Sequence, residues 1–152
     1  NPPVKKSATG GAPRSNDPEA RKRIEVAAVA YATRYYKSIE GGERTVESVE
    51  RDAVGWDLNA IGPADTLKVE VKGLTGREPV VELTPNEYEA MRSPEHRKHY
   101  VIFIVTEAST PSERAHIFRY DAKASTEKKA VWVSHSGREL EIEERTGARL
   151  RG

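Results

Sequence analysis

The segment from Tyr100 to Val105 is a continuous apolar run in a sequence of which 32% is charged. It is far shorter than the roughly 20 residues that a helix needs to cross a bilayer. A strand with one face in water alternates between apolar and polar residues, whereas a strand buried on both faces is apolar throughout. Tyr100 to Val105 therefore predicts a central, buried strand.

Helical and extended patterns alternate around this run. Asp17 followed by Pro18 predicts the start of a helix, whose apolar residues recur at helical spacing until Gly41-Gly42 ends the segment. A second helix is predicted from Thr84 to about Ser93. Further strands are predicted at 45–49, 54–61, 67–72, 115–120 and 131–134, with one more expected between 138 and 152. This order predicts an α/β fold around one mixed sheet.

The 152 residues suit one domain and a tail. Residues 1–16 are rich in Pro, Gly, Ser and Lys and lack apolar periodicity, which predicts a flexible linker or disordered lead-in. Residues 17–152 are predicted to form the domain. Because the chain begins with Asn rather than Met, we expect it to be a fragment of a larger protein or a processed form.

Composition excludes several kinds of site. The absence of cysteine excludes disulfides, thiolate metal sites and cysteine nucleophiles, and it fits a cytoplasmic location. Neither a membrane span nor a signal peptide is visible, so we expect no membrane partner. The net charge is only +1, so contacts with nucleic acid must come from local clusters or from partner domains.

The segment 67–72 alternates between apolar and charged residues. Glu70 and Lys72 share one face of this predicted strand, and the other face is apolar, with Leu67, Val69 and Val71. In the preceding segment, Asp57 points away from its apolar neighbours. The charged side chains are therefore expected on the faces of these strands that do not pack into the core, where they could form a functional site. The alternative is a solvated polar surface with a Glu70–Lys72 ion pair.

A turn at 62–65 joins these two segments into a predicted hairpin. If the turn is centred between residues 63 and 64, Asp57 falls opposite Glu70, and a slip in the turn would undo this pairing. Two like charges across an antiparallel pair repel each other. A divalent cation between them reverses this effect, and Mg²⁺ or Mn²⁺ needs only a couple of carboxylates.

Glu25 is a third acidic candidate. Its neighbours on a helical wheel are apolar, namely Ala28, Val29 and Ala32. A carboxylate in such an arc is costly unless it is paired or bound to a metal. The alternative is a salt bridge with Arg21 or Lys22 at helical spacing.

Three motifs followed by an apolar strand resemble the PD-(D/E)XK superfamily of restriction-endonuclease-like folds. They are Gly-Trp-Asp-Leu at 55–58, Val-Glu-Val-Lys-Gly at 69–73 and Leu-Thr-Pro-Asn-Glu-Tyr at 83–88. More narrowly, they are similar to a branch often appended to helicases and ATPases of bacterial defence systems. The resemblance covers roughly residues 20–107 and implies a mixed sheet flanked by helices. The C-terminal part departs from the pattern, which leaves its substrate contacts open.

The resemblance also implies roles for single residues. Asp57 and Glu70 would bind the metal with help from the carbonyl of Val71, and Lys72 would be catalytic. Glu25 matches the acidic residue that many members carry on the first core helix, where it would complete the metal's shell directly or through water. The Glu-x-Lys pattern is weak alone, and its strand context gives it weight.

These features predict a Mg²⁺- or Mn²⁺-dependent endonuclease domain that hydrolyses phosphodiester bonds of DNA within a larger defence or DNA-processing protein. Helicase or ATPase domains are the expected partners, and the sequence indicates no oligomeric state. One alternative is a non-cleaving module of the same fold that binds nucleic acid or protein. The other is an unrelated α/β interaction domain with an accidental acidic pair.

Other polar residues have simpler interpretations. Thr84 and Glu87 are expected to form a structural capping box. The basic run 96–99 is expected to be a solvated loop, with a phosphate-contacting cluster or a zinc pair as alternatives. Trp56 is expected to face the core.

Overall fold

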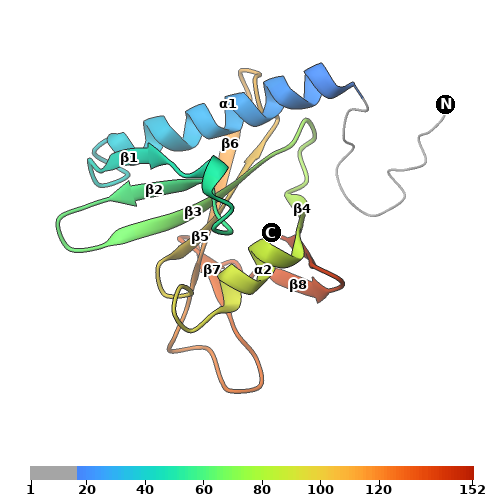
Figure 1. Cartoon of the computed structure of the whole chain (residues 1–152). Helices are drawn as coiled ribbons and strands as arrows, with labels where there is room; N and C mark the ends of the chain where they lie inside the picture. The colour runs from blue at the N-terminus through green and yellow to red at the C-terminus, as the bar shows by residue number, and fades with distance from the viewer. Residues whose placement is uncertain (1–16) are drawn as a thin grey trace.

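The computed structural model describes residues 17–152; the predicted lead-in, 1–16, lies outside this range. Two α-helices, one short 3₁₀ helix and nine strands follow one another along the described chain (Figure 1). The helices are α1 (Pro18–Lys37), η2 (Glu50–Asp52) and α2 (Pro85–Arg92). The strands are β1 (Thr45–Ser48), β2 (Leu58–Ile61), β3 (Thr66–Gly73), β4 (Val80–Leu83), β5 (Tyr100–Thr106), β6 (Arg114–Tyr120), β7 (Trp132–Ser134), β8 (Glu141–Glu144) and β9 (Ala148–Arg151).

Six of the strands form one mixed sheet in the order β1-β2-β3-β5-β6-β7. β3 and β5 run parallel at its centre, and the other pairs are antiparallel. A second, three-stranded sheet has the order β4-β9-β8. The predicted α/β class, a restriction-endonuclease-like mixed sheet flanked by helices, is confirmed.

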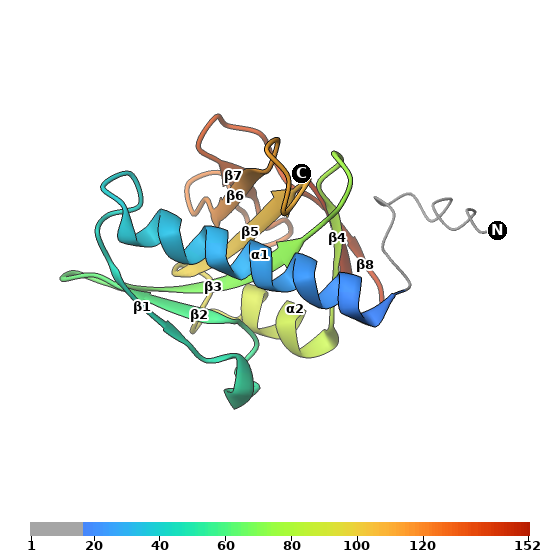
Figure 2. The same cartoon turned by 90° about the horizontal axis from the view of Figure 1, so that it is seen from above.

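β5 is the buried central strand that its apolar sequence predicts. Every one of its residues is buried. Val101, Phe103 and Val105 belong to the core on the α1 side, whereas Tyr100, Ile102 and Ile104 belong to the core beneath α2 and the small sheet. Because side chains alternate along a strand, one apolar run supplies both cores. Figures 1 and 2 show α1 on one side of the main sheet and α2 on the other.

Both helices begin with the predicted caps. The side chain of Asp17 accepts a hydrogen bond from Glu19 N, with Pro18 following in the first turn. Thr84 and Glu87 form a complete capping box. Within residues 17–152, no helix is both long and apolar enough to span a bilayer.

The hairpin has the predicted register but a shorter first strand. Leu58 pairs with Val69 and Asn59 with Lys68, so the residue before Leu58 is level with Glu70. The expectation of a strand over 54–61 is wrong for its first half. Ala53 and Gly55 have positive φ angles of 52° and 102°, which are not extended conformations, and the strand begins only at Leu58.

The small sheet was not predicted in full. The sequence led us to expect a single strand after residue 138, whereas β8 and β9 both form there and β9 pairs with β4. β4 is only four residues long and runs directly into the capping box of α2. Its partner β9 lies at the C-terminal end of the chain, so no local turn signal marks the pairing.

Phe103 tests the α1-side core. Its side chain is fully buried and lies against Tyr31, Tyr35 and Tyr36 of α1. We expect Phe103→Ala to lower the free energy of unfolding by about 3–5 kcal/mol, measured by urea denaturation, because the change removes buried apolar surface and leaves a cavity that the core fills only in part. Ile39→Ala is the control, since Ile39 is 84% exposed and should change stability by less than about 0.5 kcal/mol. Equal effects of the two changes would contradict this packing.

Candidate functional site

The loop before β2 is held against α2 at Gly55. A Cβ at this position would lie 2.6 Å from the Cβ of Ala90, and the φ angle of 102° also favours glycine. The buried hydroxyl of Tyr100 donates to the carbonyl of Gly55 at 2.6 Å. These contacts fix where the chain enters β2, and thereby fix Asp57.

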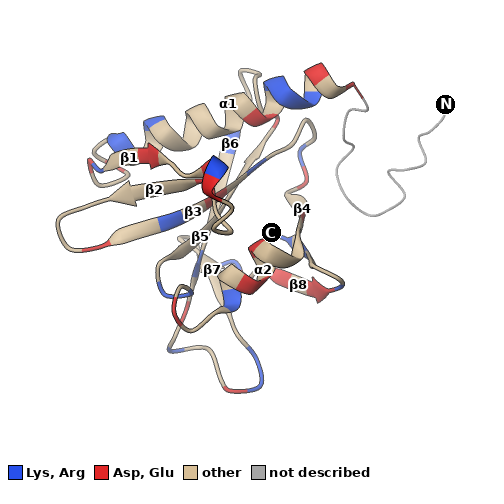
Figure 3. Cartoon of the chain, in the orientation of Figure 1, with Lys and Arg blue, Asp and Glu red and all other residues tan. Residues whose placement is uncertain are grey.

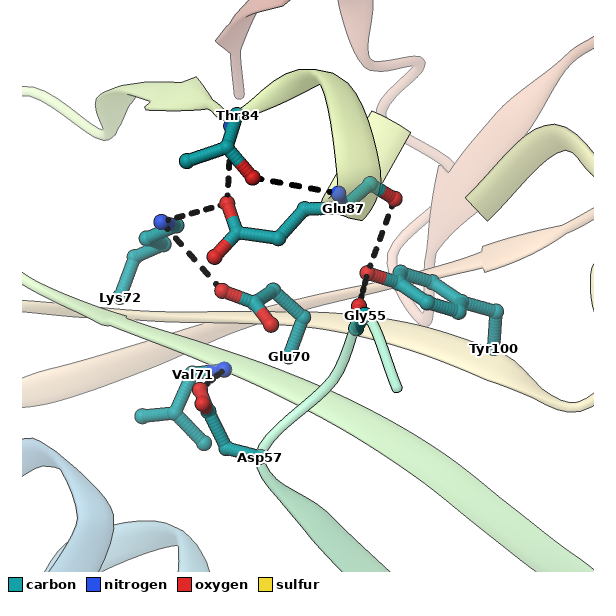
Figure 4. A network of polar contacts seen from close by, with 8 residues as sticks. All are labelled: Gly55, Asp57, Glu70, Val71, Lys72, Thr84, Glu87 and Tyr100. Atoms are coloured by element: carbon teal, nitrogen blue, oxygen red, sulfur yellow. Dashed lines mark hydrogen bonds and ion pairs between the residues drawn. The ribbon is translucent and has the colours of Figure 1, made fainter. Parts of the chain in front are cut away.

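Asp57 lies where β2 begins and extends its carboxylate along the edge of β3. Its backbone N–H donates to the carbonyl of Val69 at 2.9 Å, and its Oδ2 accepts from the backbone N–H of Val71 at 2.9 Å (Figure 4). In an extended strand, the N–H and C=O of one residue point toward the same edge. The carbonyl of Val71 therefore points toward the side on which Asp57 lies.

Glu70 is the buried acid of the site. Its side chain is 2% exposed, and Oε2 lies 3.3 Å from Nζ of Lys72. Oε1 is buried without a hydrogen-bond partner. Figure 4 shows the carboxylate between Lys72 on one side and Asp57 on the other. A buried carboxylate oxygen with no partner is costly, so such atoms are found mainly where a ligand or function compensates.

Lys72 joins the strand to α2. Its Nζ lies 3.0 Å from Oε1 of Glu87, in addition to its contact with Glu70. Oε1 of Glu87 also accepts from the backbone N–H of Thr84 at 2.9 Å. One carboxylate oxygen thus caps the helix and holds the lysine.

Glu87 is the site residue that the sequence interpretation missed. The predicted capping box is confirmed, but the sequence pattern favoured a structural role for Glu87 over a place in the site. The capping pattern satisfies a backbone donor and leaves the carboxylate free to accept from a second group. Only the approach of α2 to β3 shows that this second group is Lys72.

Because they are buried, Asp57 and Glu70 hold a proton more tightly than exposed carboxyl groups do. Burial raises the pKa of Asp57 from 3.8 to about 6, against the opposing effects of the Val71 N–H and of Lys72. Burial also raises the pKa of Glu70 well above its ordinary value, and the charges of Asp57 and Glu87 add to this, while Lys72 opposes it. The pair resists holding two negative charges unless a cation joins it.

The surroundings of Lys72 and Glu87, in contrast, favour the charged forms of both groups. Burial lowers the pKa of Lys72, but the carboxylates of Glu70 and Glu87 outweigh it, so the pKa of Lys72 is raised overall. Burial raises the pKa of Glu87, but Lys72 and the N–H of Thr84 outweigh it, so its pKa is lowered. Both groups therefore carry their charges at neutral pH.

Glu25 lies apart from this network. Its side chain is exposed, whereas the buried residues of α1 form a narrow stripe, namely Ala28, Ala32 and Tyr36. α1 packs against the face of β3 that is opposite to Glu70 and Lys72. The expected burial of Glu25 is therefore wrong, because the apolar arc is narrower than the helical wheel implied. Its role as a metal ligand stays a prediction.

The oxygen donors at the site fit a small, hard cation. Asp57 and Glu70 supply two carboxylates, one with an unpartnered oxygen, and Val71 supplies a carbonyl. No group of three or more His, Asp or Glu side chains within residues 17–152 is arranged to hold a metal. Mg²⁺ does not require such a group, because it keeps several waters and binds through one or two carboxylates. Because no such three-residue group exists within residues 17–152, the basic run 96–99 is not part of a zinc site there.

The raised pKa of Asp57 has a consequence for stability. The folded protein holds this proton more tightly than the unfolded chain does, so the contribution to stability is fully present below about pH 4 and is lost as the pH rises through about 6. In EDTA, we expect the melting temperature of Asp57→Asn to exceed that of the wild type by several degrees at pH 7. The difference should disappear near pH 4, because asparagine resembles the protonated acid.

Circular dichroism melts across this pH range measure the effect. Added Mg²⁺ should raise the melting temperature of the wild type at pH 7 more than that of Asp57→Asn. Identical pH dependence in the two proteins would show that Asp57 is not the group that resists ionisation.

Comparison with known proteins places the chain in a family. Residues 24–119, more than half of its length, match the family model described as Protein NO VEIN, C-terminal. This span begins in α1 and ends in β6, so it contains Asp57, Glu70, Lys72 and Glu87. No curated protein matches the chain. No solved structure matches it either. The chain belongs to the Protein NO VEIN C-terminal family.

Proposed function

We propose that this domain is a metal-dependent nuclease that hydrolyses phosphodiester bonds of DNA. The observation that carries the proposal is the carboxylate of Glu70, which is 2% exposed and has one oxygen without a partner, beside Asp57 and Lys72. A structural ion pair would not need a second acid against it. Two acids and an ammonium on adjoining strands match the PD-(D/E)XK pattern that the sequence resembles.

The residues that would hold Mg²⁺ or Mn²⁺ are Asp57, Glu70 and Val71 through its carbonyl. A bound ion of this kind supplies a Lewis acid for a phosphoryl oxygen and lowers the pKa of a bound water. The carboxylates of Asp57 and Glu70 contribute the negative charge that attracts the ion. Because the pKa of Asp57 is about 6, this acid ionises near neutral pH, where the domain would accept the cation.

Lys72 supplies the positive charge of the site. Its ammonium has three N–H donors, and the carboxylates of Glu70 and Glu87 account for two of them. The third can orient the attacking water or donate to an oxygen of the phosphate as negative charge develops there. The raised pKa of Lys72 keeps it protonated, so it acts as a donor and not as a general base.

Glu87 positions this lysine. Its carboxylate is fixed by the N–H of Thr84, so it holds the ammonium of Lys72 at a set place over β3. A lysine side chain is flexible, and restricting it beforehand removes an entropic cost from the reaction. The capped start of α2 is therefore part of the proposed catalytic apparatus.

A non-cleaving module of the same fold is the second candidate, and the net charge of +1 favours it. Figure 3 shows acidic and basic residues interspersed along the chain. Tight binding of DNA needs several phosphate contacts from lysine and arginine. We therefore propose that helicase or ATPase domains of a larger defence or DNA-processing protein supply much of the affinity for DNA.

The decisive test is cleavage of plasmid and single-stranded DNA with Mg²⁺, Mn²⁺ or EDTA. We expect metal-dependent cutting by the wild type and a loss of at least about a hundredfold in Lys72→Ala, because a preorganised donor to developing charge is removed. Cutting that survives in Lys72→Ala would contradict the assigned site. A wild type that binds DNA and Mg²⁺ but never cuts would establish the non-cleaving module.

Glu87→Gln tests the positioning role, with Glu89→Gln as its matched control on the same helix. Glu89 pairs with Arg92 and its side chain is 70% exposed. We expect Glu87→Gln to lower kcat with little change in KM, and to lower the pH at which Lys72 loses its proton. Glu89→Gln should change neither. Equal kcat values for the two variants would remove Glu87 from the site.

A further inference from the structure

Lys68 is a cation beside the site that the proposed chemistry does not use. It lies on β3 two residues before Glu70 and four before Lys72. Because side chains alternate along a strand, all three share the face opposite to α1. Lys72 has two carboxylate partners, whereas Lys68 has no ion pair with any acid in the described part of the chain.

Neutral groups hold this ammonium in place. Nζ of Lys68 lies 2.7 Å from Nδ1 of His96 and 5.3 Å from the centre of the Trp56 ring. Since an ammonium can only donate, Nδ1 of His96 accepts, and the proton of the neutral ring is on Nε2. Neither His96 nor the Trp56 ring carries a negative charge, so the groups that Nζ contacts do not cancel the charge of Lys68.

The partners of Lys68 are themselves fixed. Nε1 of Trp56 donates to Oδ1 of Asn59 at 2.9 Å, and Asn59 is the residue paired with Lys68 across the hairpin. The ring of His96 lies against Trp56 with a centroid distance of 4.9 Å. The carbonyl of His99 accepts from the backbone N–H of Lys68 at 2.8 Å, which ties the 96–99 loop to β3. A lysine held this firmly is preorganised to bind an anion.

The spacing along β3 suits a chain of phosphates. Residues two apart on a strand are about 6.6–6.8 Å apart, which is close to the separation of neighbouring phosphates in a nucleic-acid strand. A DNA strand that runs along β3 with one phosphate at Glu70 and Lys72 would therefore place its next phosphate near Lys68. An ammonium without a counter-ion is the group that such a phosphate needs.

We propose that Lys68, held by His96 and Trp56, binds the non-scissile DNA phosphate next to the one at Glu70 and Lys72. This inference rests on the proposed nuclease function and adds a second subsite to it. Sequence analysis favoured a solvated loop for residues 96–99. The contact between His96 and Lys68 instead assigns this loop to the support of a phosphate subsite.

The salt dependence of DNA binding tests the subsite separately from cleavage. The probe is a short fluorescein-labelled DNA, single-stranded and then duplex, bound by the full chain in EDTA and followed by anisotropy. Lys68→Gln removes the charge but retains a donor for His96. We expect it to weaken binding about five- to eightfold near 0.1 M salt and to reduce the slope of log K against log salt by just under one.

Two further variants serve as controls. Lys68→Arg retains the charge and should retain the slope. Lys37→Gln removes an exposed lysine from the end of α1, on the other side of the sheet, and should change neither affinity nor slope. Melting temperatures of all variants show whether folding is altered, and binding is measured well below the lowest of them so that every variant is folded in the assay.

The outcomes separate this inference from the proposed function. Wild-type affinity and slope in Lys68→Gln would overturn the subsite and leave the nuclease proposal intact. The same loss in Lys37→Gln would also overturn it, because the effect would then be one of total charge. A wild type with no salt-dependent binding to either DNA would overturn the subsite, whereas the proposed substrate is tested separately by metal-dependent cleavage.

Discussion

The burial of one carboxylate determines how the rest of this site is arranged. Glu70 lies at 2% exposure in a face of β3 that packs beneath α2, where an isolated negative charge is strongly disfavoured. Lys72 compensates it at one oxygen, and the other oxygen has no partner. The proximity of Asp57 makes the imbalance greater, since a second acid raises the pKa of the first. A site of this kind has excess affinity for a proton or a cation.

The position of α2 couples helix capping to this chemistry. Glu87 satisfies the N–H of Thr84 and holds Lys72 with the same oxygen. The hydroxyl of Tyr100 reaches the carbonyls of Gly55 and Glu87, at 2.6 and 3.3 Å, and so links the entry to β2 with the start of α2. The elements that carry the acids and the lysine are therefore held together by the same few contacts, and a shift of α2 would alter all of them.

The two faces of the main sheet have different roles. On the α1 side, Phe103 and the tyrosines of α1 form an aromatic core without charged groups at its centre. On the α2 side, β3 carries Lys68, Glu70 and Lys72 in a row beside the second core. The alternation of a strand permits this division, because one element can contribute apolar residues to one layer and charged residues to the other.

Local patterns were sufficient for most of the fold. The sequence alone determined the buried central strand, both capped helices, and the shared face of Glu70 and Lys72, because each depends on the short-range periodicity or capping chemistry of adjacent residues. It predicted that Asp57 lies level with Glu70 only for one centring of the turn, and the structure has that register. Only the tertiary structure decided the pairing of β4 with β9, the exposure of Glu25, and the contacts of Glu87 with Lys72 and of His96 with Lys68. These depend on how elements distant in sequence pack, and local periodicity does not encode the distance between two side chains on different elements.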